Sequence, residues 1–382
     1  MIKRQQEKII LSLVNKYPIL ALTGPRQSGK TTLLKSIFPK YRYISLENID
    51  NRTFATDDPK AFLQKYDAYV IFDEVQRVPS LFSYIQTIVD ESKKMGHYIL
   101  TGSQNFNLLE HITQSLAGRV IIFKLFPFDI TELKEENLLD NNYKKQLIKG
   151  FYPAIYDRNL NPSIYYANYI QTYVQRDISQ LINIQDSYKF NNFVKLCAGR
   201  IGQILNINNL AKDCGISQPT AKSWLSILEK SYILFLLRPY YENFNKRIIK
   251  SPKLYFYDVG LASYLLDIRS VEDITENQKG NLFENLIVAD LYKQNEHQYQ
   301  LMEYWYWRDS NGNEIDLLKK QGTVFDIYEI KSSTTILPKM IKGLDYFDKI
   351  SNRKVKSKTL IYAGDENQNR TKFSVKSWKL LN

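Results

Sequence analysis

One stretch of the sequence places two glycines, a lysine and a threonine at the spacing of a phosphate-binding loop. Residues 24–31 read Gly-Pro-Arg-Gln-Ser-Gly-Lys-Thr, the pattern G-x-x-x-x-G-K-[ST]. Glycines let the backbone wrap around phosphates, and successive N–H groups then point at the anion. Lys30 would reach the β- and γ-phosphates of ATP, and Thr31 would ligate Mg²⁺. The predicted nucleotide contacts are Gly24, Pro25, Arg26, Gln27, Ser28, Gly29, Lys30, Thr31, Thr32 and, further along the chain, Ser103.

Two adjacent carboxylates follow an apolar run about 40 residues later. Residues 69–72 are all apolar or aromatic, and Asp73 and Glu74 come directly after them. Such a run predicts a strand buried on both faces of a parallel sheet, with the acids at its carboxyl end, where ligands bind. Asp73 would hold Mg²⁺, and Glu74 would activate the attacking water as general base. The alternative is a strand end with two solvated acids.

Two further polar positions suit the same chemistry. Ser103 or Gln104, after a second apolar strand run, would orient the water or the γ-phosphate. Arg119, before the run 120–125, is a candidate for neutralising charge on the γ-phosphate, in cis or in trans. A plain strand cap and a surface arginine are the respective alternatives.

A second set of charged residues lies near the C-terminus. Asp316 ends up on one predicted strand, Glu329 and Lys331 on the next, and Glu284 on a helix that opens at Gly280. Glu329 and Lys331 share a strand face because side chains alternate. Asp316 and Glu329 would share a Mg²⁺ that activates water, with Lys331 neutralising charge and Glu284 as a further ligand or proton carrier.

The order helix-Glu, strand-Asp, Glu-x-Lys resembles the PD-(D/E)-x-K nuclease superfamily. The resemblance implies a restriction-endonuclease-like α/β domain and Mg²⁺-dependent phosphodiester chemistry on DNA. A nuclease-like fold kept only for nucleic-acid or protein contact is the alternative.

The elements around the first site indicate an α/β parallel sheet. Strand 19–22 precedes the loop, a helix with an apolar face follows it, and further strands are predicted at 41–46, 69–73 and 97–104. Four motifs, GPRQSGKTT (24–32), FDEVQ (72–76), LTGSQ (100–104) and LAGR (116–119), resemble a bacterial and archaeal family of AAA+/STAND-like P-loop ATPases. The resemblance implies ATP hydrolysis and an additional strand, 97–104, inserted between the loop strand and the Asp-Glu strand. It also makes Arg176 a candidate nucleotide sensor, against a local ion pair.

The middle of the chain is predicted to be mainly helical. Helices are expected over 132–149 and 165–181, and residues 207–217 and 218–230 have helix-turn-helix spacing. The runs 232–237 and 253–257 would form the hairpin of a winged form. Its exposed polar positions, which would face DNA, are Gln218, Thr220, Lys222 and Ser223. The predicted domains are 1–130 (ATPase core), 131–205 (helical lid), 206–268 (winged-helix-like) and 269–382 (nuclease-like).

Composition constrains partners and compartment. The chain has 382 residues, with 52 Lys plus Arg against 40 Asp plus Glu, a formal charge of +12. That balance favours an anionic partner, DNA first, although a merely solubilising surface would give the same count. No apolar run approaches ~18 residues, so no membrane span is expected. Two cysteines and scattered histidines predict a cytoplasmic protein without disulfides or zinc. A role for Arg119 in trans would require a homo-oligomer.

Overall fold

The computed structural model describes residues 2–102, 108, 112, 114–178, 186–241, 249–352 and 354–381, with the side chain of Asp177 left out. The chain forms two compact units. Unit 1 comprises residues 1–128 and 296–300, and unit 2 comprises residues 129–295 and 301–382.

Unit 1 is built on a five-stranded sheet in which every pairing is parallel. The strand order is β2-β3-β4-β1-β5. The strands are β1 (Ile19–Thr23), β2 (Arg42–Ser45), β3 (Val70–Asp73), β4 (Tyr98–Thr101) and β5 (Val120–Lys124). The predicted insertion of β4 between the loop strand β1 and the Asp-Glu strand β3 is confirmed.

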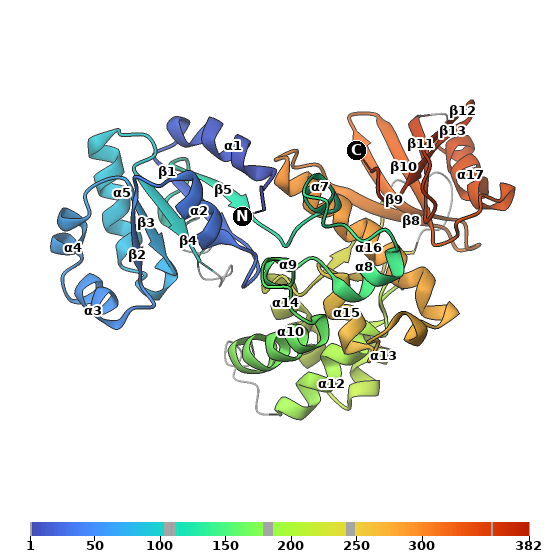
Figure 1. Ribbon diagram of the computed structural model, residues 1–382, viewed down its shortest axis with the longest axis horizontal. Helices are drawn as coiled ribbons and strands as arrows, with labels where there is room; N and C mark the ends of the chain where they lie inside the picture. The colour runs from blue at the N-terminus through green and yellow to red at the C-terminus, as the bar shows by residue number, and fades with distance from the viewer. Residues whose placement is uncertain are drawn as a thin grey trace. The chain divides into compact units, whose positions relative to one another are not determined.

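Alternating side chains of this sheet bury two separate cores, one on each face. Ile19, Ala21 and Phe72 lie in the core that also contains residues of α4 (Pro59–Lys65) and α5 (Leu81–Ser92). Leu20 and Leu22 lie in the core shared with α1 (Gln6–Leu13) and α2 (Lys30–Ile37). Figure 1 shows these helices around the sheet. Helices therefore pack against both faces of the sheet. The remaining elements of unit 1 are η1 (Val14–Lys16), α3 (Ile49–Asp57) and η2 (Val75–Arg77).

The helical part of unit 2 departs from prediction near its start. The predicted helix 132–149 is two helices, α7 (Ile130–Glu135) and α8 (Tyr143–Lys149). Asn137 takes a positive φ of 56°, and the Asn142 side chain accepts a hydrogen bond from Lys144 N at 2.9 Å, capping α8. Asparagine side chains compete with helical backbone bonds and favour caps, so they end one helix and start the next. The following helices are α9 (Pro153–Asp157), α10 (Pro162–Tyr169) and a π-helix, η3 (Ile170–Ile178).

The helix-turn-helix spacing predicted for residues 207–230 produces the expected elements. After α12 (Ser187–Ala198) come α13 (Ile207–Cys214) and α14 (Gln218–Lys230). Gly215 between them has φ 65°, and Ser217 caps α14. Strands β6 (Leu234–Leu237) and β7 (Lys253–Phe256) then pair as an antiparallel hairpin. The elements α15 (Val259–Leu265) and η4 (Val271–Asp273) follow.

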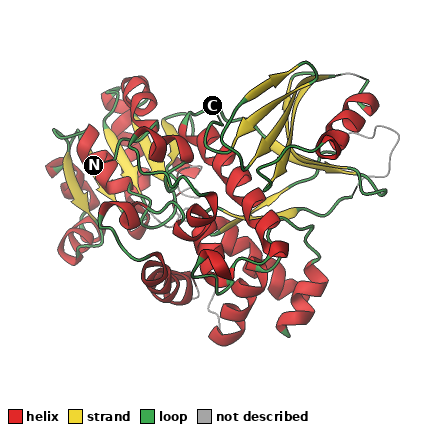
Figure 2. Cartoon of the chain, turned by 45° about the vertical axis from the view of Figure 1, so that its right-hand side comes forward, coloured by secondary structure: helices red, strands yellow, loops and turns green. Residues whose placement is uncertain are grey.

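The C-terminal part of unit 2 is a six-stranded mixed sheet, drawn in yellow in Figure 2. Its order is β12-β13-β11-β10-β9-β8. The elements are α16 (Glu276–His297), β8 (Tyr304–Arg308), β9 (Glu314–Gln321), β10 (Val324–Lys331), η5 (Pro338–Ile341), α17 (Lys342–Ile350), β11 (Val355–Tyr362), β12 (Gln368–Arg370) and β13 (Phe373–Ser377). Strands β8, β9 and β10 are antiparallel neighbours, and β11 runs parallel to β10.

Helix α16 begins earlier than its glycine suggested. It starts at Glu276 rather than at Gly280. Gln278 N donates to Thr275 Oγ1 at 3.3 Å, and Thr275 N donates to Gln278 Oε1 at 3.2 Å, a reciprocal cap that sets the start. Across the part of the chain that the structure describes, no helix is both long and apolar enough to cross a membrane.

Candidate functional site

The phosphate-binding loop lies between β1 and α2, and its glycines are required by the backbone. Gly24 has φ 143°, and a Cβ there would overlap the carbonyl oxygen of Leu125. Gly29 has φ 93° and precedes the first residue of α2. No side chain caps the N-terminus of α2 among the described residues, so its N–H groups face the loop. This backbone arrangement is the one that phosphate-binding loops use to hold an anion.

Lys30 is held inside the loop. Its side chain is 7% exposed, and its ammonium donates to the carbonyl oxygens of Gly24 at 2.9 Å and Pro25 at 2.8 Å. Burial lowers the pKa of Lys30 to about 8, and the charges of Glu74 and Asp73 oppose that shift. The carbonyl oxygens of the loop itself therefore hold the lysine ammonium in place.

The two predicted Mg²⁺ ligands of unit 1 meet in the structure. Thr31 Oγ1 donates to Asp73 Oδ2 at 3.2 Å, and the Tyr43 hydroxyl donates to the same oxygen. Burial raises the pKa of Asp73, and the hydrogen bond from Tyr43 opposes the rise. A hydroxyl beside a carboxylate at the carboxyl end of β3 is a donor set that fits Mg²⁺.

Glu74, the predicted general base, sits in a constrained turn. It has a positive φ of 56°, and Gln76 Nε2 donates to its Oε2 at 2.5 Å. The amide fixes the carboxylate orientation. Tyr43 and Gln76 were not predicted as site residues. Gln76 could have been found from its place in the FDEVQ motif. Tyr43 could not, because it reaches Asp73 from the neighbouring strand β2.

Arg4 is a third residue that the sequence did not indicate. It is 5% exposed, and its guanidinium donates to Ser28 O in the loop at 2.9 Å and to Phe126 O at 2.7 Å. It also lies 4.8 Å from the centre of the Phe128 ring. Arg4 thus fastens the phosphate-binding loop to the segment after β5.

Arg119 lies at the end of the strands opposite to the phosphate-binding loop. Its carbonyl oxygen accepts from Ile19 N at 3.1 Å, at the first residue of β1, whereas the loop follows the last, Thr23. The five residues of β1 separate the two levels by roughly 16 Å. The guanidinium pairs with Asp90 on α5, with Nε–Oδ1 at 2.6 Å. This placement contradicts one of the two modes left open, in which Arg119 acts on phosphates bound by its own chain. Ser103 and Gln104 lie outside the described residues.

In unit 2, three of the four predicted C-terminal site residues converge. Asp316 on β9 lies beside Glu329 on β10, one step beyond the last paired residues of the two strands. Lys331 Nζ is 3.4 Å from Asp316 Oδ2 and 2.5 Å from Glu329 Oε1. Burial and the charge of Asp316 raise the pKa of Glu329 to about 8, whereas Lys331 and Lys253 outweigh burial and hold the pKa of Asp316 below its usual value.

The fourth residue, Glu284 on α16, is bound by β7 of the hairpin. Lys253 Nζ is 2.8 Å from Glu284 Oε1, and the Tyr255 hydroxyl donates to that oxygen at 2.5 Å. Lys253 also pairs with Glu314 on β9. Lys253, Tyr255 and Glu314 were not predicted as site residues. Alternation placed Glu314 on the face of Asp316, but no local signal connected β7 with α16.

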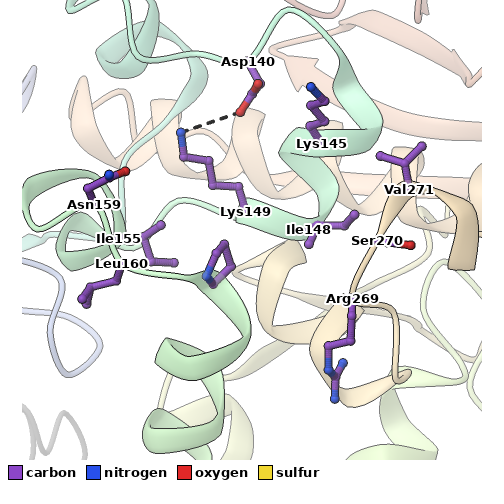
Figure 3. A pocket seen from close by; sticks show the side chains of 11 residues that line it. Asp140, Lys145, Ile148, Lys149, Ile155, Asn159, Leu160, Arg269, Ser270 and Val271 are labelled. Carbon is purple, nitrogen blue, oxygen red and sulfur yellow. Dashed lines mark ion pairs between the residues drawn. The ribbon is translucent and has the colours of Figure 1, made fainter.

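A pocket of about 370 Å³ lies elsewhere in unit 2 (Figure 3). Its charged lining residues are Asp140, Lys145, Lys149 and Arg269. Lys149 Nζ is 3.7 Å from Asp140 Oδ2, drawn as a dashed line in Figure 3, and Arg269 stacks on Tyr264. The pocket contains none of the predicted site residues.

Comparisons with known proteins agree with the first of these sites. Residues 16–134 match the family model described as an AAA domain. Residues 140–272 and 279–381 match two models described as domains of unknown function, DUF8612 and DUF4143. The sheet, the loop and the first match support a P-loop ATPase domain of the AAA type over residues 16–134, and with it ATP binding and hydrolysis.

Relatives extend over most of the chain. An uncharacterized protein of Mycobacterium tuberculosis is 28% identical over 328 residues, covering 84% of this chain and 72% of that protein. Another from Methanocaldococcus jannaschii is 25% identical over 348 residues, covering 76% and 72%. Among solved structures, a Walker-type ATPase of Pyrococcus abyssi aligns with a TM-score of 0.46 and 15% identity, over 70% of this chain and 96% of that one.

Proposed function

We propose that this protein hydrolyses ATP with Mg²⁺ and couples that cycle to a C-terminal domain that acts on DNA. The ATPase half rests on one observation above the others: Lys30 is buried in the loop while Thr31 and Asp73 meet beside it. These are the three groups that position and neutralise a nucleoside triphosphate.

Each residue has a distinct part in the proposed hydrolysis. The loop N–H groups and Lys30 bind the phosphates and neutralise charge that develops on the γ-phosphate. Thr31 and Asp73 would hold Mg²⁺, which supplies Lewis-acid stabilisation of the phosphate oxygens. Glu74, oriented by Gln76, accepts the proton of the attacking water.

Phosphate release by the full chain tests this half of the proposal. We expect Lys30→Ala to abolish turnover and Asp73→Asn to reduce it at least about a hundredfold, the scale of removing one electrostatic group. Lys40→Ala, an exposed lysine after α2, is the matched control and should leave turnover unchanged. Normal turnover in Lys30→Ala would exclude hydrolysis at this loop.

For the C-terminal domain we propose phosphodiester chemistry of the PD-(D/E)-x-K kind. The observation that supports it is the bridge of Lys331 to both Asp316 and Glu329. The order α16-β8-β9-β10-α17-β11, with β11 parallel to β10, fits this superfamily. The net positive charge of +12 favours DNA as the substrate.

The residues fit a divalent cation. Glu329 Oε2 is buried and has no hydrogen-bond partner among the described residues. Among the described residues, Asp316 accepts hydrogen bonds through Oδ2 alone, from Ile330 N at 2.8 Å and from Lys331 Nζ. Asp316 and Glu329 would hold Mg²⁺, which supplies an activated water and charge stabilisation; two carboxylates plus waters are a usual Mg²⁺ environment. Lys331 neutralises charge on the scissile phosphate.

Two other roles use the same domains without cutting. One is a nucleotide-switched DNA-binding protein, in which the helix-turn-helix region and hairpin act as a winged helix. The other is a STAND-like signalling ATPase whose C-terminal domain binds protein.

The deciding experiment incubates the full chain with linear and supercoiled DNA, Mg²⁺ and ATP. We expect cleavage that is abolished in Asp316→Ala and retained in Asp326→Ala, a carboxylate on β10 that bonds Ser357 instead. Lys30→Ala reports whether ATP controls cleavage. Intact DNA throughout, with ATP still hydrolysed, would exclude the nuclease and favour the two non-cutting roles.

A further inference from the structure

The carboxylate site contains a lysine that comes from outside the C-terminal domain. Lys253 opens β7, within the segment 140–272 that a separate family model matches. Its side chain is 3% exposed, against 36% for Lys331. A buried ammonium requires ionic partners, and Lys253 pairs with both Glu284 and Glu314.

Glu284 is fully engaged by this strand on one of its oxygens. Its Oε1 receives both the Lys253 ammonium at 2.8 Å and the Tyr255 hydroxyl at 2.5 Å. Lys253 and Tyr255 are two residues apart on β7, so they project to the same side. The carboxylate of Glu284 is therefore oriented towards β7 by two donors.

Glu314 is held in a similar way. Lys253 pairs with its Oε1, and Arg308 Nη1 lies 2.7 Å from its Oε2. Asp316 and Glu329, by contrast, share Lys331. The ion pairs thus divide the four acids: Lys253 contacts Glu284 and Glu314, the second of which also has Arg308, and the more exposed Lys331 contacts Asp316 and Glu329.

We infer that Lys253 is a fixed internal cation that pairs with Glu284 and Glu314. Because these two acids are already neutralised, the site accepts a single divalent cation, at Asp316 and Glu329. This inference rests on the proposed phosphodiester function for the identity of the metal site. It makes Lys253 a positioning residue and Glu284 its partner rather than a metal ligand. It also makes the hairpin β6–β7 an integral part of the site, so the segment 279–381 alone lacks one of its charges.

Binding of Mn²⁺ to the nucleotide-free full chain tests the inference without any need for turnover. Calorimetry or Mn²⁺ electron paramagnetic resonance gives the number of bound ions and their affinity. All samples carry Asp73→Asn, which removes the carboxylate of the ATP site. We expect one bound ion, with affinity at least about tenfold weaker in Asp316→Asn, because losing a group that only positions a ligand already costs about 10–100-fold and losing the ligand costs no less.

Two substitutions then separate a ligand from a partner of Lys253. Glu284→Gln should leave Mn²⁺ affinity within about twofold, whereas loss of a metal ligand, or of a group that orients one, weakens it about tenfold or more. Lys253→Met should bind a second ion, because Glu284 and Glu314 no longer have their shared cation. Adding Glu284→Gln to Lys253→Met should remove that second ion. Lys253→Arg keeps the charge, and Lys250→Met changes an exposed lysine nearby; both should bind one ion.

The outcomes distinguish this inference from the function beneath it. One ion in both the parent protein and Lys253→Met, or a weakened Glu284→Gln, overturns the internal cation and leaves the metal site standing. No ion in the parent but binding in Lys253→Met supports the internal cation and overturns the metal-dependent function. No ion in either overturns both. If Lys253→Met does not fold, Glu284→Gln alone decides.

Discussion

Arg4 shows how a single buried side chain can set the shape of the phosphate-binding loop. Its guanidinium bonds Ser28 O and Phe126 O, two carbonyls far apart in the sequence. Charged hydrogen bonds of this kind are stronger than neutral ones and define a geometry. The loop is therefore held from behind, on the side away from its phosphate-binding N–H groups.

Arg4→Gln should weaken nucleotide binding and lower the free energy of unfolding by about 2 kcal/mol, because two buried carbonyls no longer have a donor. Titration with a fluorescent ATP analogue and urea denaturation would measure the two effects. Lys3→Gln, at the exposed neighbouring position, is the control. Unchanged nucleotide affinity in Arg4→Gln would mean that Arg4 only packs the N-terminus.

Gly24 occupies a position where no side chain fits. Gly24→Ala should lower the free energy of unfolding by about 3 kcal/mol, because φ is 143° and the new Cβ would overlap Leu125 O. Gly118→Ala is a matched control, since φ is 78° there and nothing lies within 4 Å of its Cβ among the described residues. It should cost about 1 kcal/mol from backbone strain alone. Urea denaturation measures both variants, and equal destabilisation of the two would contradict the clash.

At the scale of elements, the direction of the strands decides which residues can meet. The carboxyl ends of β1 and β3 bring the loop, Thr31 and Asp73 together. Because β5 is parallel to β1, Arg119 at the amino end of β5 lies at the opposite end of the strands. Any contact of Arg119 with a γ-phosphate would therefore require another copy of the chain.

An Arg119 that acts in trans predicts ATP turnover per chain that rises with protein concentration. Arg119→Ala should remove that rise, because the interface between copies then lacks its cation. Asp90→Ala breaks the same ion pair but keeps the arginine, and should retain the rise. Phosphate release measured over a range of protein concentrations decides the matter. Turnover per chain that does not vary with concentration would exclude the role.

At the scale of the whole molecule, the proposed binding to DNA would depend on net charge. The excess of 52 basic over 40 acidic residues should make duplex binding fall steeply between about 50 and 200 mM salt. The helix-turn-helix region contributes Lys212 and Lys222, both exposed. Its surface is thus one place where phosphates would bind.

Lys212→Gln combined with Lys222→Gln should reduce the salt slope of DNA binding by about two, one for each phosphate that is no longer neutralised. Lys60→Gln with Lys94→Gln removes the same charge from exposed positions of unit 1 and is the control. Fluorescence anisotropy of a labelled duplex at several salt concentrations measures the slope. Equal slopes in the two double variants would place DNA binding outside this region.

Sequence patterns were sufficient wherever neighbours along one element carry the signal. The loop motif, the Asp73-Glu74 strand end, the hairpin β6–β7 and the alternation that joins Glu329 to Lys331 were all predicted in this way. The break between α7 and α8 was missed because asparagine caps override a charged helical pattern. The start of α16 was predicted at Gly280, which is wrong for a similar reason: the cap at Thr275 starts the helix earlier.

The sequence by itself determined that this protein carries a nucleotide-binding loop with its acidic partners, because those groups lie at fixed spacing on adjoining elements. Only the tertiary structure decided that Arg4 backs the loop, that Arg119 faces away from it and that Lys253 neutralises Glu284. The partners of Arg4 and Lys253 are 122 and 31 residues distant. Such pairs form because burial forces each charge to find an opposite group or a carbonyl, wherever packing brings one near.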